Sequence, residues 1–279
     1  MLQGLAIWHY PHRSISDNIR FFASQGFDSL SVHGSQMVNA LEDPTVGKEL
    51  ASAVCENGIV LTVHYSLPRN HSTEAVEVFR RGISALAEWQ REYGLISVLS
   101  FDVPQSVRDG AGIGTYLNYV LETVSDCRIA VEDFGLNQPE RDQITHLKGH
   151  PRFGYLVDIG HLFLRIRGLY TGGKTLFTYA PDEHIQTLCP DRTAFRDALA
   201  SKEFPIFEIH LHNNDGVNDL HWFLEQGELD IRAVADALKD LQYDGILTIE
   251  SAPGYRFECR GNDADEGILR TFSYWKSLL

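Results

Sequence analysis

The chain has few of the features that mark a disulfide-stabilised, zinc-knuckle or membrane protein. Its four cysteines, Cys55, Cys127, Cys189 and Cys259, lie far apart and form no Cys-x-x-Cys pair, which argues against a disulfide framework and a zinc knuckle. No run of about eighteen apolar residues is present, and the N-terminus has neither the basic start nor the apolar core of a secretion signal. We therefore expect a soluble cytoplasmic protein with reduced cysteines and no membrane partner.

Basic residues are also scarce. The sequence has 24 lysines and arginines against 38 aspartates and glutamates, for a formal net charge of −14. Such a charge repels polyanions at long range unless a local basic patch overrides it. Nucleic acid is therefore a disfavoured partner, although bound divalent cations would neutralise part of the negative charge.

A glycine-rich phosphate loop is missing after the first apolar run, where an open doubly wound sheet would favour one. The chain has Trp8–Arg13 (WHYPHR) at this point. Eight short apolar or β-branched runs alternate instead with segments of helical periodicity, and this alternation predicts parallel βαβ units. The predicted strands are Leu5–His9, Ser29–His33, Val60–His64, Ser97–Asp102, Ile129–Asp133, Gly154–Asp158, Ile206–His212 and Gly245–Glu250. The predicted helices are Ser16–Ser24, Val46–Glu56, Thr73–Glu92, Thr115–Ser125, Arg192–Ala200, Ile231–Leu241 and Glu266–Ser277.

This pattern predicts an α/β fold, a single-domain (β/α)8 TIM barrel that spans residues 1–279. The longest irregular segment, Arg165–Asp191, follows the sixth strand and contains Gly172, Gly173 and Pro181. Long segments of this kind often carry function, so this one is a candidate lid over the barrel mouth.

Ligand-type side chains stand at the ends of the last four predicted strands. They are Glu132, Asp158, His212 and Glu250. A barrel of this class carries its active site at the C-terminal strand ends, where isolated charges usually occur paired or bound to metal. Three carboxylates and one imidazole suit a divalent ion such as Mn²⁺, Mg²⁺, Co²⁺ or Zn²⁺. Each residue alone could instead cap a helix or pair with arginine, but four on consecutive strands favour a metal site.

Two histidines compete for the ligand position on the seventh strand. His210 and His212 are two residues apart and therefore point to the same face. We expect His210 to lie deeper, hydrogen-bonded and neutral in the packed interior. His212 would lie at the rim and act as the ligand.

Other strand-end residues are candidates for substrate binding or for additional metal ions. His161 follows Asp158 by three residues and would lie in the loop beyond the strand, where it could bind a second cation or a substrate hydroxyl. His64 and Asp102 end the third and fourth predicted strands, and together with Glu132 they could bind a further ion. We expect His64, Asp102 and His161 to line the substrate site.

An Asp-x-His sequence follows the seventh strand. Asp219 and His221 could join His161 around a cation, although such a sequence is often a turn residue beside a solvated histidine. His9 and His33 end the first two predicted strands and could line the mouth, although we favour hydrogen-bonded core residues over this alternative.

These strand-end motifs resemble those of the xylose isomerase-like TIM barrel superfamily, which contains sugar (phosphate) isomerases and epimerases together with the type IV apurinic (AP) endonucleases. The resemblance covers nearly the whole chain, and its motifs are specific in combination rather than singly. They are Val131–Gly135 (VEDFG), Asp158–His161 (DIGH), His212–Asp215 (HNND), Asp219–His221 (DLH), Gln226–Ile231 (QGELDI) and Ile249–Glu250 (IE).

The resemblance implies a divalent ion held by Glu132, Asp158, His212 and Glu250, with the two glutamates also moving protons. In the endonucleases, further residues complete a three-metal cluster. The positions of this sequence that match those further residues are His64, His161, Asp219 and His221. The sequence departs from the endonuclease pattern at Asp102, where that pattern has a histidine.

We expect an enzyme of carbohydrate metabolism, a metal-dependent isomerase or epimerase of a small sugar or sugar-like hydroxy-carbonyl compound. A chelated cation polarises the carbonyl and acidifies the neighbouring C–H, so that Glu132 or Glu250 can remove a proton and the other can return one. The alternative is a metal-dependent phosphodiester hydrolase of the AP endonuclease type, which the net charge and Asp102 disfavour. A non-catalytic sugar-binding barrel would lack one of the four metal-ligating residues, and this sequence has all four. The sugar, its phosphorylation, the metal and a homo-oligomeric state stay open.

Overall fold

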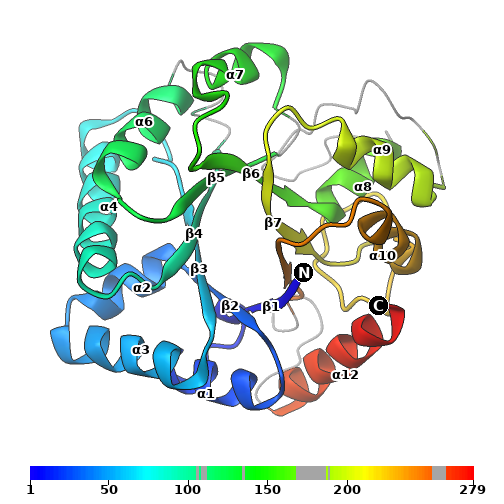
Figure 1. The fold of residues 1–279 in the computed structure, drawn as a ribbon, viewed down its shortest axis with the longest axis horizontal. Coiled ribbons are helices and arrows are strands. Elements are labelled where there is room, and N and C mark those ends of the chain that lie inside the picture. The colour runs from blue at the N-terminus through cyan, green and yellow to red at the C-terminus, as the bar shows by residue number, and fades with distance from the viewer. Residues whose placement is uncertain (105–106, 108–111, 134–135, 168–186, 188, 253–261) are drawn as a thin grey trace.

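Eight parallel strands pair in chain order and close into a barrel, because β8 also pairs with β1 (Figure 1). The computed structural model describes residues 1–104, 107, 112–133, 136–167, 187, 189–252 and 262–279. The strands are β1 Leu2–Ala6, β2 Ser29–His33, β3 Val60–Ser66, β4 Ile96–Asp102, β5 Arg128–Glu132, β6 Phe153–Asp158, β7 Ile206–Leu211 and β8 Ile246–Ile249. The predicted single-domain (β/α)8 TIM barrel is thereby confirmed.

The first strand differs from its prediction. It was predicted at Leu5–His9, whereas β1 is Leu2–Ala6 and a 3-10 turn occupies Ile7–His9. The strand begins earlier because Leu2 pairs in register with Ile246 of β8, a partner that local sequence cannot reveal. His9 consequently lies beyond the strand end.

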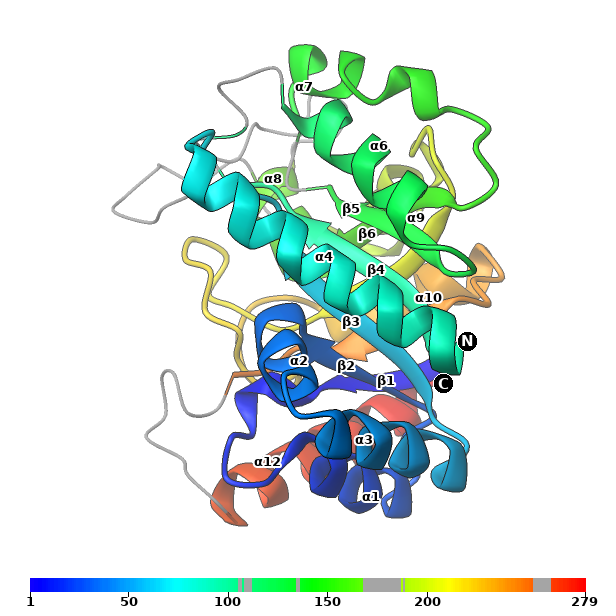
Figure 2. The same ribbon diagram turned by 90° about the vertical axis from the view of Figure 1, so that its left-hand side faces the viewer.

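Helices follow the strands and form a ring around the barrel (Figure 1, Figure 2). They are α1 Ile15–Ser24, α2 Gly34–Leu41, α3 Pro44–Asn57, α4 Thr73–Tyr93, α6 Ile113–Thr123, α7 Gln138–Asp142, α8 Ile159–Arg167, α9 Arg192–Ala200, α10 Ile231–Asp240 and α12 Asn262–Leu278. Side-chain caps fix several starts, since Asp43, Asp191 and Asp230 each accept a hydrogen bond from a backbone amide in the first turn. No helix among the described residues combines the length and the apolar character needed to cross a membrane.

Three helices, α2, α7 and α8, were absent from the sequence prediction. Helix α8 starts directly after β6, so that Arg165 to Arg167 of the candidate lid Arg165–Asp191 belong to a regular helix. Residues 168–186 and 188 of that segment lie outside the described residues. The proposed lid stays a prediction.

The barrel interior changes from apolar to polar along the strands. A small apolar cluster contains only strand residues, and on four strands the residue two positions further along the same face is polar. The apolar members of these pairs are Val98, Ala130, Leu156 and Ile246, and their polar successors are Ser100, Glu132, Asp158 and Thr248. A larger apolar cluster packs the outer strand faces against the helices. The interior thus presents polar groups toward the C-terminal mouth.

Candidate metal centre

Titratable side chains from non-adjacent parts of the sequence meet at the C-terminal mouth of the barrel. Glu132 and Asp158 end β5 and β6, Glu250 directly follows β8, and His64 and His210 lie near the ends of β3 and β7. All five are at least 91 % buried. The remaining candidates, His161, His212, Asp219 and His221, come from α8 and from the connection that follows β7.

Glu132 lies between two histidines. Its Oε1 atom is 3.0 Å from Nδ1 of His161, and its Oε2 atom is 3.7 Å from Nε2 of His64. Burial raises the pKa of Glu132 to about 8, against the opposing effect of His161. His161 occupies the first turn of α8 rather than the loop predicted from sequence, because the helix begins immediately after Asp158.

Asp158 is the carboxylate that links the two sides of the site. Its Oδ1 atom accepts a hydrogen bond from the backbone amide of His161 over 2.9 Å and lies 3.1 Å from Nε2 of His212. Burial alone would raise the pKa of Asp158, but the charges of His161 and His212 outweigh this effect and lower it. The carboxylate therefore stays ionised.

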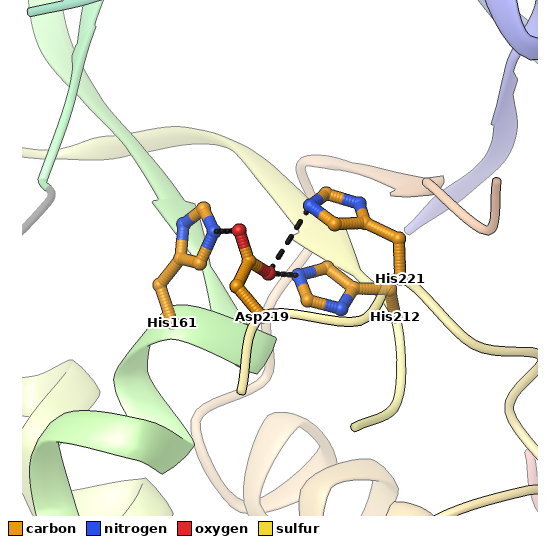
Figure 3. A group of neighbouring side chains, drawn as sticks. All are labelled: His161, His212, Asp219 and His221. Carbon is orange, nitrogen blue, oxygen red and sulfur yellow. Dashed lines mark ion pairs between the residues drawn. The ribbon is translucent and has the colours of Figure 1, made fainter. Parts of the chain in front are cut away.

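His161, His212, Asp219 and His221 form a compact group of four candidate ligands (Figure 3). Asp219 lies between the imidazoles: its Oδ2 atom is 3.2 Å from Nε2 of His161, and its Oδ1 atom is 3.2 Å from Nε2 of His221. The rings of His212 and His221 stack with centroids 3.8 Å apart. One ligand atom from each of the four lies within 4.8 Å of the others. His212 was predicted as a principal ligand and the other three as additional ligands, and the four residues do come together.

Asn213 holds the connection that carries Asp219 and His221. Its amide nitrogen donates to the carbonyls of Leu224 and Leu229, and its Oδ1 atom accepts from the amides of Asn214 and Leu229. These bonds fold the connection back over the site. His221 itself has a left-handed backbone with φ of 47°, a strained conformation of the kind often found at functional sites.

His212 is fully buried rather than exposed at a rim. Its ring stacks on His221 on one side, and on another side it approaches Gly160 so closely that a Cβ atom there would lie 2.2 Å from Cε1 of His212. Glycine at position 160 therefore allows α8 to start against this imidazole.

His210 is hydrogen-bonded, as predicted, and its two ring nitrogens face two carboxylates. Its Nδ1 atom donates to Oε2 of Glu250 over 2.9 Å. Burial lowers the pKa of His210, but Glu250 and Glu208 outweigh burial and raise it well above the usual range. The prediction did not consider Glu208, although it lies two residues away on the same face of the strand, and Glu250 lies 40 residues away in the sequence.

His64 and Asp102 differ in their relation to the site. His64 bonds to Ser100 through Nδ1 over 3.0 Å and lies near Glu132, whereas Asp102 belongs to none of the candidate ligand groups formed by the described residues. Burial raises the pKa of Asp102 to about 6, opposed by a hydrogen bond from Ser66. A shared ion between His64, Asp102 and Glu132 therefore gains no support from this arrangement.

The sequence over residues 19–277 matches the family described as xylose isomerase-like TIM barrel. The chain belongs to this family. Among solved structures, a D-psicose 3-epimerase from Clostridium cellulolyticum H10 is similar at a TM-score of 0.67 and 12 % identity, covering 100 % of this chain and 99 % of that one. A D-tagatose 3-epimerase-like protein is similar at a TM-score of 0.68 and 17 % identity, covering 99 % of each chain. At these identities the structural likeness concerns the fold.

One curated relative matches a short segment. "Uncharacterized protein MJ1311" of Methanocaldococcus jannaschii is 32 % identical over 57 residues, which is 20 % of this chain and 20 % of that protein. The match thus covers only about a fifth of the relative's length.

The described residues of this xylose isomerase-like barrel fit a divalent cation. Oδ2 of Asp158 and Nε2 of His212 are buried without a hydrogen bond among the described residues, and such atoms are what a bound cation would satisfy. The candidate groups are His161, His212, Asp219 and His221; His9, His221 and Glu250; Glu132, Asp158 and His161; and Asp158, His210 and Glu250. The predicted set of Glu132, Asp158, His212 and Glu250 spans these groups and stays a prediction.

His9 is a site residue that the sequence prediction assigned to the core. Its Nε2 atom lies 3.9 Å from Oε1 of Glu250, and its ring lies 6.2 Å from that of His221. The neighbouring Trp8 is half-buried and stacks on His64 with a centroid distance of 5.8 Å. Because β1 ends at Ala6, His9 and Trp8 both lie beyond the strand end. The sequence prediction placed them inside the strand and therefore missed their position at the site. In this xylose isomerase-like barrel, they add an aromatic wall beside the ligand groups.

Proposed function

We propose that the protein is a divalent-metal-dependent isomerase or epimerase of a small sugar or sugar-like hydroxy-carbonyl compound. One observation carries this proposal: Glu132 and Glu250 lie at the C-terminal ends of β5 and β8 at one mouth, each hydrogen-bonded to its own histidine. Both belong to ligand groups that share Asp158. Two carboxylates around one centre are what a two-step proton transfer at carbon requires.

The residues that would hold the cation are Glu132, Asp158, His212 and Glu250, with His64, His161, Asp219 and His221 as additional ligands. When bound, a divalent ion would polarise the substrate carbonyl and acidify the neighbouring C–H. The chemistry of the donors does not choose among Mn²⁺, Mg²⁺, Co²⁺ and Zn²⁺, because carboxylates and imidazoles together suit all four.

Glu132 and Glu250 would exchange the proton. One glutamate takes the carbon-bound proton, and the other gives a proton to the opposite face of that carbon or to the adjacent one. His161 and His210 orient the two carboxylates through the bonds at 3.0 and 2.9 Å. Because one proton is removed and one returned, the substrate leaves with its composition unchanged.

The substrate would lie between the ligand groups and the opposite wall of the mouth. His64, His161 and Asp102 are the proposed contacts to its hydroxyl groups, and Trp8 offers a half-buried ring to its apolar face. The two similar solved structures are named as a D-psicose 3-epimerase and a D-tagatose 3-epimerase-like protein, which makes free ketoses the first substrates to test.

Proton exchange from D₂O into a ketose panel, followed by NMR in the presence of each of the four metals, tests the proposal. We expect metal-dependent exchange at one carbon, reduced by about 100-fold or more in Glu132→Gln or Glu250→Gln. Glu88→Gln, at an exposed position on α4, is the matched control and should exchange at the wild-type rate. Absence of exchange across free and phosphorylated ketoses would refute the proposal.

A second candidate is a metal-dependent phosphodiester hydrolase, favoured by the group His161, His212, Asp219 and His221, which could hold a second cation beside the first. The net charge of −14 disfavours it, because a DNA-binding surface needs a basic footprint. Nicking of abasic-site duplex with turnover, together with silence toward the ketoses, would establish this alternative.

A further inference from the structure

Glu208 is a carboxylate buried in the interior of the barrel, below the mouth. It lies on β7, two residues before His210, and has no solvent exposure. Its Oε1 atom accepts hydrogen bonds from the hydroxyls of Thr62, over 3.0 Å, and Thr248, over 2.6 Å. Thr62 belongs to β3, which is not a neighbour of β7, so this bond crosses the barrel interior.

A buried carboxylate at this position costs stability. Ion pairs and carboxylates removed from water are often less favourable than apolar residues of similar volume. An apolar alternative is available nearby, because Leu156, Phe207 and Ile246, on β6, β7 and β8, belong to one buried apolar cluster. Among the described residues, Glu208 forms an ion pair with His210, whose Nε2 atom lies 3.5 Å from Oε1 of Glu208. Packing does not account for the carboxylate, and such exceptions are typical of functional sites.

His210 connects Glu208 to Glu250. Its two ring nitrogens face two different carboxylates, with Nε2 toward Glu208 and Nδ1 within 2.9 Å of Oε2 of Glu250. The other oxygen of Glu250, Oε1, lies 3.9 Å from both His9 and His221. Glu250 therefore turns one oxygen toward the interior and the other toward the mouth.

We propose that Glu208 is a positioning residue that acts on Glu250 through His210. The Thr62 and Thr248 hydroxyls fix Glu208, Glu208 fixes the orientation of the imidazole, and the imidazole holds Oε2 of Glu250 so that Oε1 is presented to the cation and the substrate. Outer partners of this kind commonly set the affinity of a metal site. The inference rests on the proposed function only for its effect on turnover. The effect of Glu208 on the orientation of Glu250 also changes the affinity for a metal ion, which can be measured without substrate.

Glu208→Gln is the principal variant, because the side-chain volume and the acceptor for the two threonines are kept while the carboxylate facing Nε2 is lost. Titration of the chelator-treated protein with Mn²⁺ by calorimetry should give a dissociation constant raised about 10-fold or more. The melting temperature of the metal-free variant should equal or exceed that of the wild type. With substrate, kcat should fall about 10-fold while KM changes less than about twofold.

Three further variants keep the test decisive. Ser31→Ala alters a fully buried residue that pairs in register with Thr62, and it should leave Mn²⁺ binding unchanged. Thr248→Val should weaken Mn²⁺ binding in the same direction as Glu208→Gln. His210→Gln should match Glu208→Gln, and the double variant should add little, since both changes break one chain of contacts.

Unchanged Mn²⁺ affinity in folded Glu208→Gln and Thr248→Val, or strict additivity of Glu208→Gln with His210→Gln, would overturn the positioning role. The two proposals fail separately. If the wild type exchanges no ketose proton but Glu208→Gln still weakens Mn²⁺ binding against an unaffected Ser31→Ala, the positioning role stands and the proposed reaction falls.

Discussion

His161 bonds Glu132 through Nδ1 over 3.0 Å while its other nitrogen, Nε2, lies 3.2 Å from Asp219. One imidazole thus joins the end of β5 to the connection after β7. Because Glu132 is buried, Asp219 is half-buried and one imidazole contacts both, any cation at this mouth would be surrounded by groups whose positions are already mutually fixed, an arrangement that reduces the cost of binding.

Removal of Asp158 should abolish stoichiometric metal. Asp158→Asn keeps the volume and the acceptor for the His161 amide but loses the carboxylate charge shared by two candidate groups. We expect less than about one tenth of wild-type metal by elemental analysis after dialysis, in a protein whose circular dichroism is unchanged. Wild-type metal content in both Asp158→Asn and Glu250→Gln would contradict the site.

His210 and His212 should differ in what their loss affects. His212→Asn should lower metal affinity and destabilise the metal-free protein less than His210→Ala does, because Asp158 keeps its contacts with His161. His210→Ala should also destabilise the fold, by roughly 3 kcal/mol, because it leaves Glu208 and Glu250 buried without their shared partner. Denaturant unfolding of the metal-free variants, in parallel with Mn²⁺ titration, separates the two effects. The opposite pattern would contradict these roles.

Lys202 should contribute to stability through a buried ion pair. Its Nζ atom lies 2.5 Å from Oδ2 of Asp133, and Arg165 lies 3.8 Å from the same oxygen. Lys202→Met should cost about 2 kcal/mol, because a charged hydrogen bond to a buried carboxylate is lost. Arg20→Met, which removes an exposed pair with Glu49, is the control and should change the free energy of unfolding far less than Lys202→Met. Equal effects of the two variants in urea unfolding would contradict this difference.

Two described cysteines should react very differently. Burial raises the pKa of Cys127 to about 12, whereas Cys55 is exposed. Since the thiolate is the reactive form, iodoacetamide at pH 8 should modify Cys55 and leave Cys127 unmodified until denaturant is added. Peptide mass spectrometry measures both sites in one sample. Rapid native alkylation of Cys127 would contradict its burial.

The architecture could be predicted from sequence because its signals are local. Apolar runs that end in polar residues repeat eight times, and the helix Arg192–Ala200 was predicted with its observed bounds. The start of β1 could not be found this way, because Leu5 to His9 continues the apolar pattern while pairing with β8 decides where the strand lies. Local sequence also gives no sign that α8 starts without a loop after Asp158.

The sequence pointed to candidate ligands but not to their grouping. Residue type and strand-end position selected Glu132, Asp158, His212 and Glu250 as candidates, and their role as ligands stays a prediction. The imidazole that each carboxylate faces depends on contacts between distant segments. His9 approaches Glu250 from the opposite end of the sequence. The depth of Glu208 likewise depends on Thr62 across the barrel.

The pairing of β1 with β8 also sets the time at which the site can assemble during synthesis. The first strand waits for its second partner until the last strand has left the ribosome, and Glu250 emerges with that strand. Translation at about 5–20 residues per second would hold the N-terminal half without a closed barrel for several seconds. Metal loading by the predicted ligands would then require synthesis at least as far as Glu250, the last of the four in the sequence.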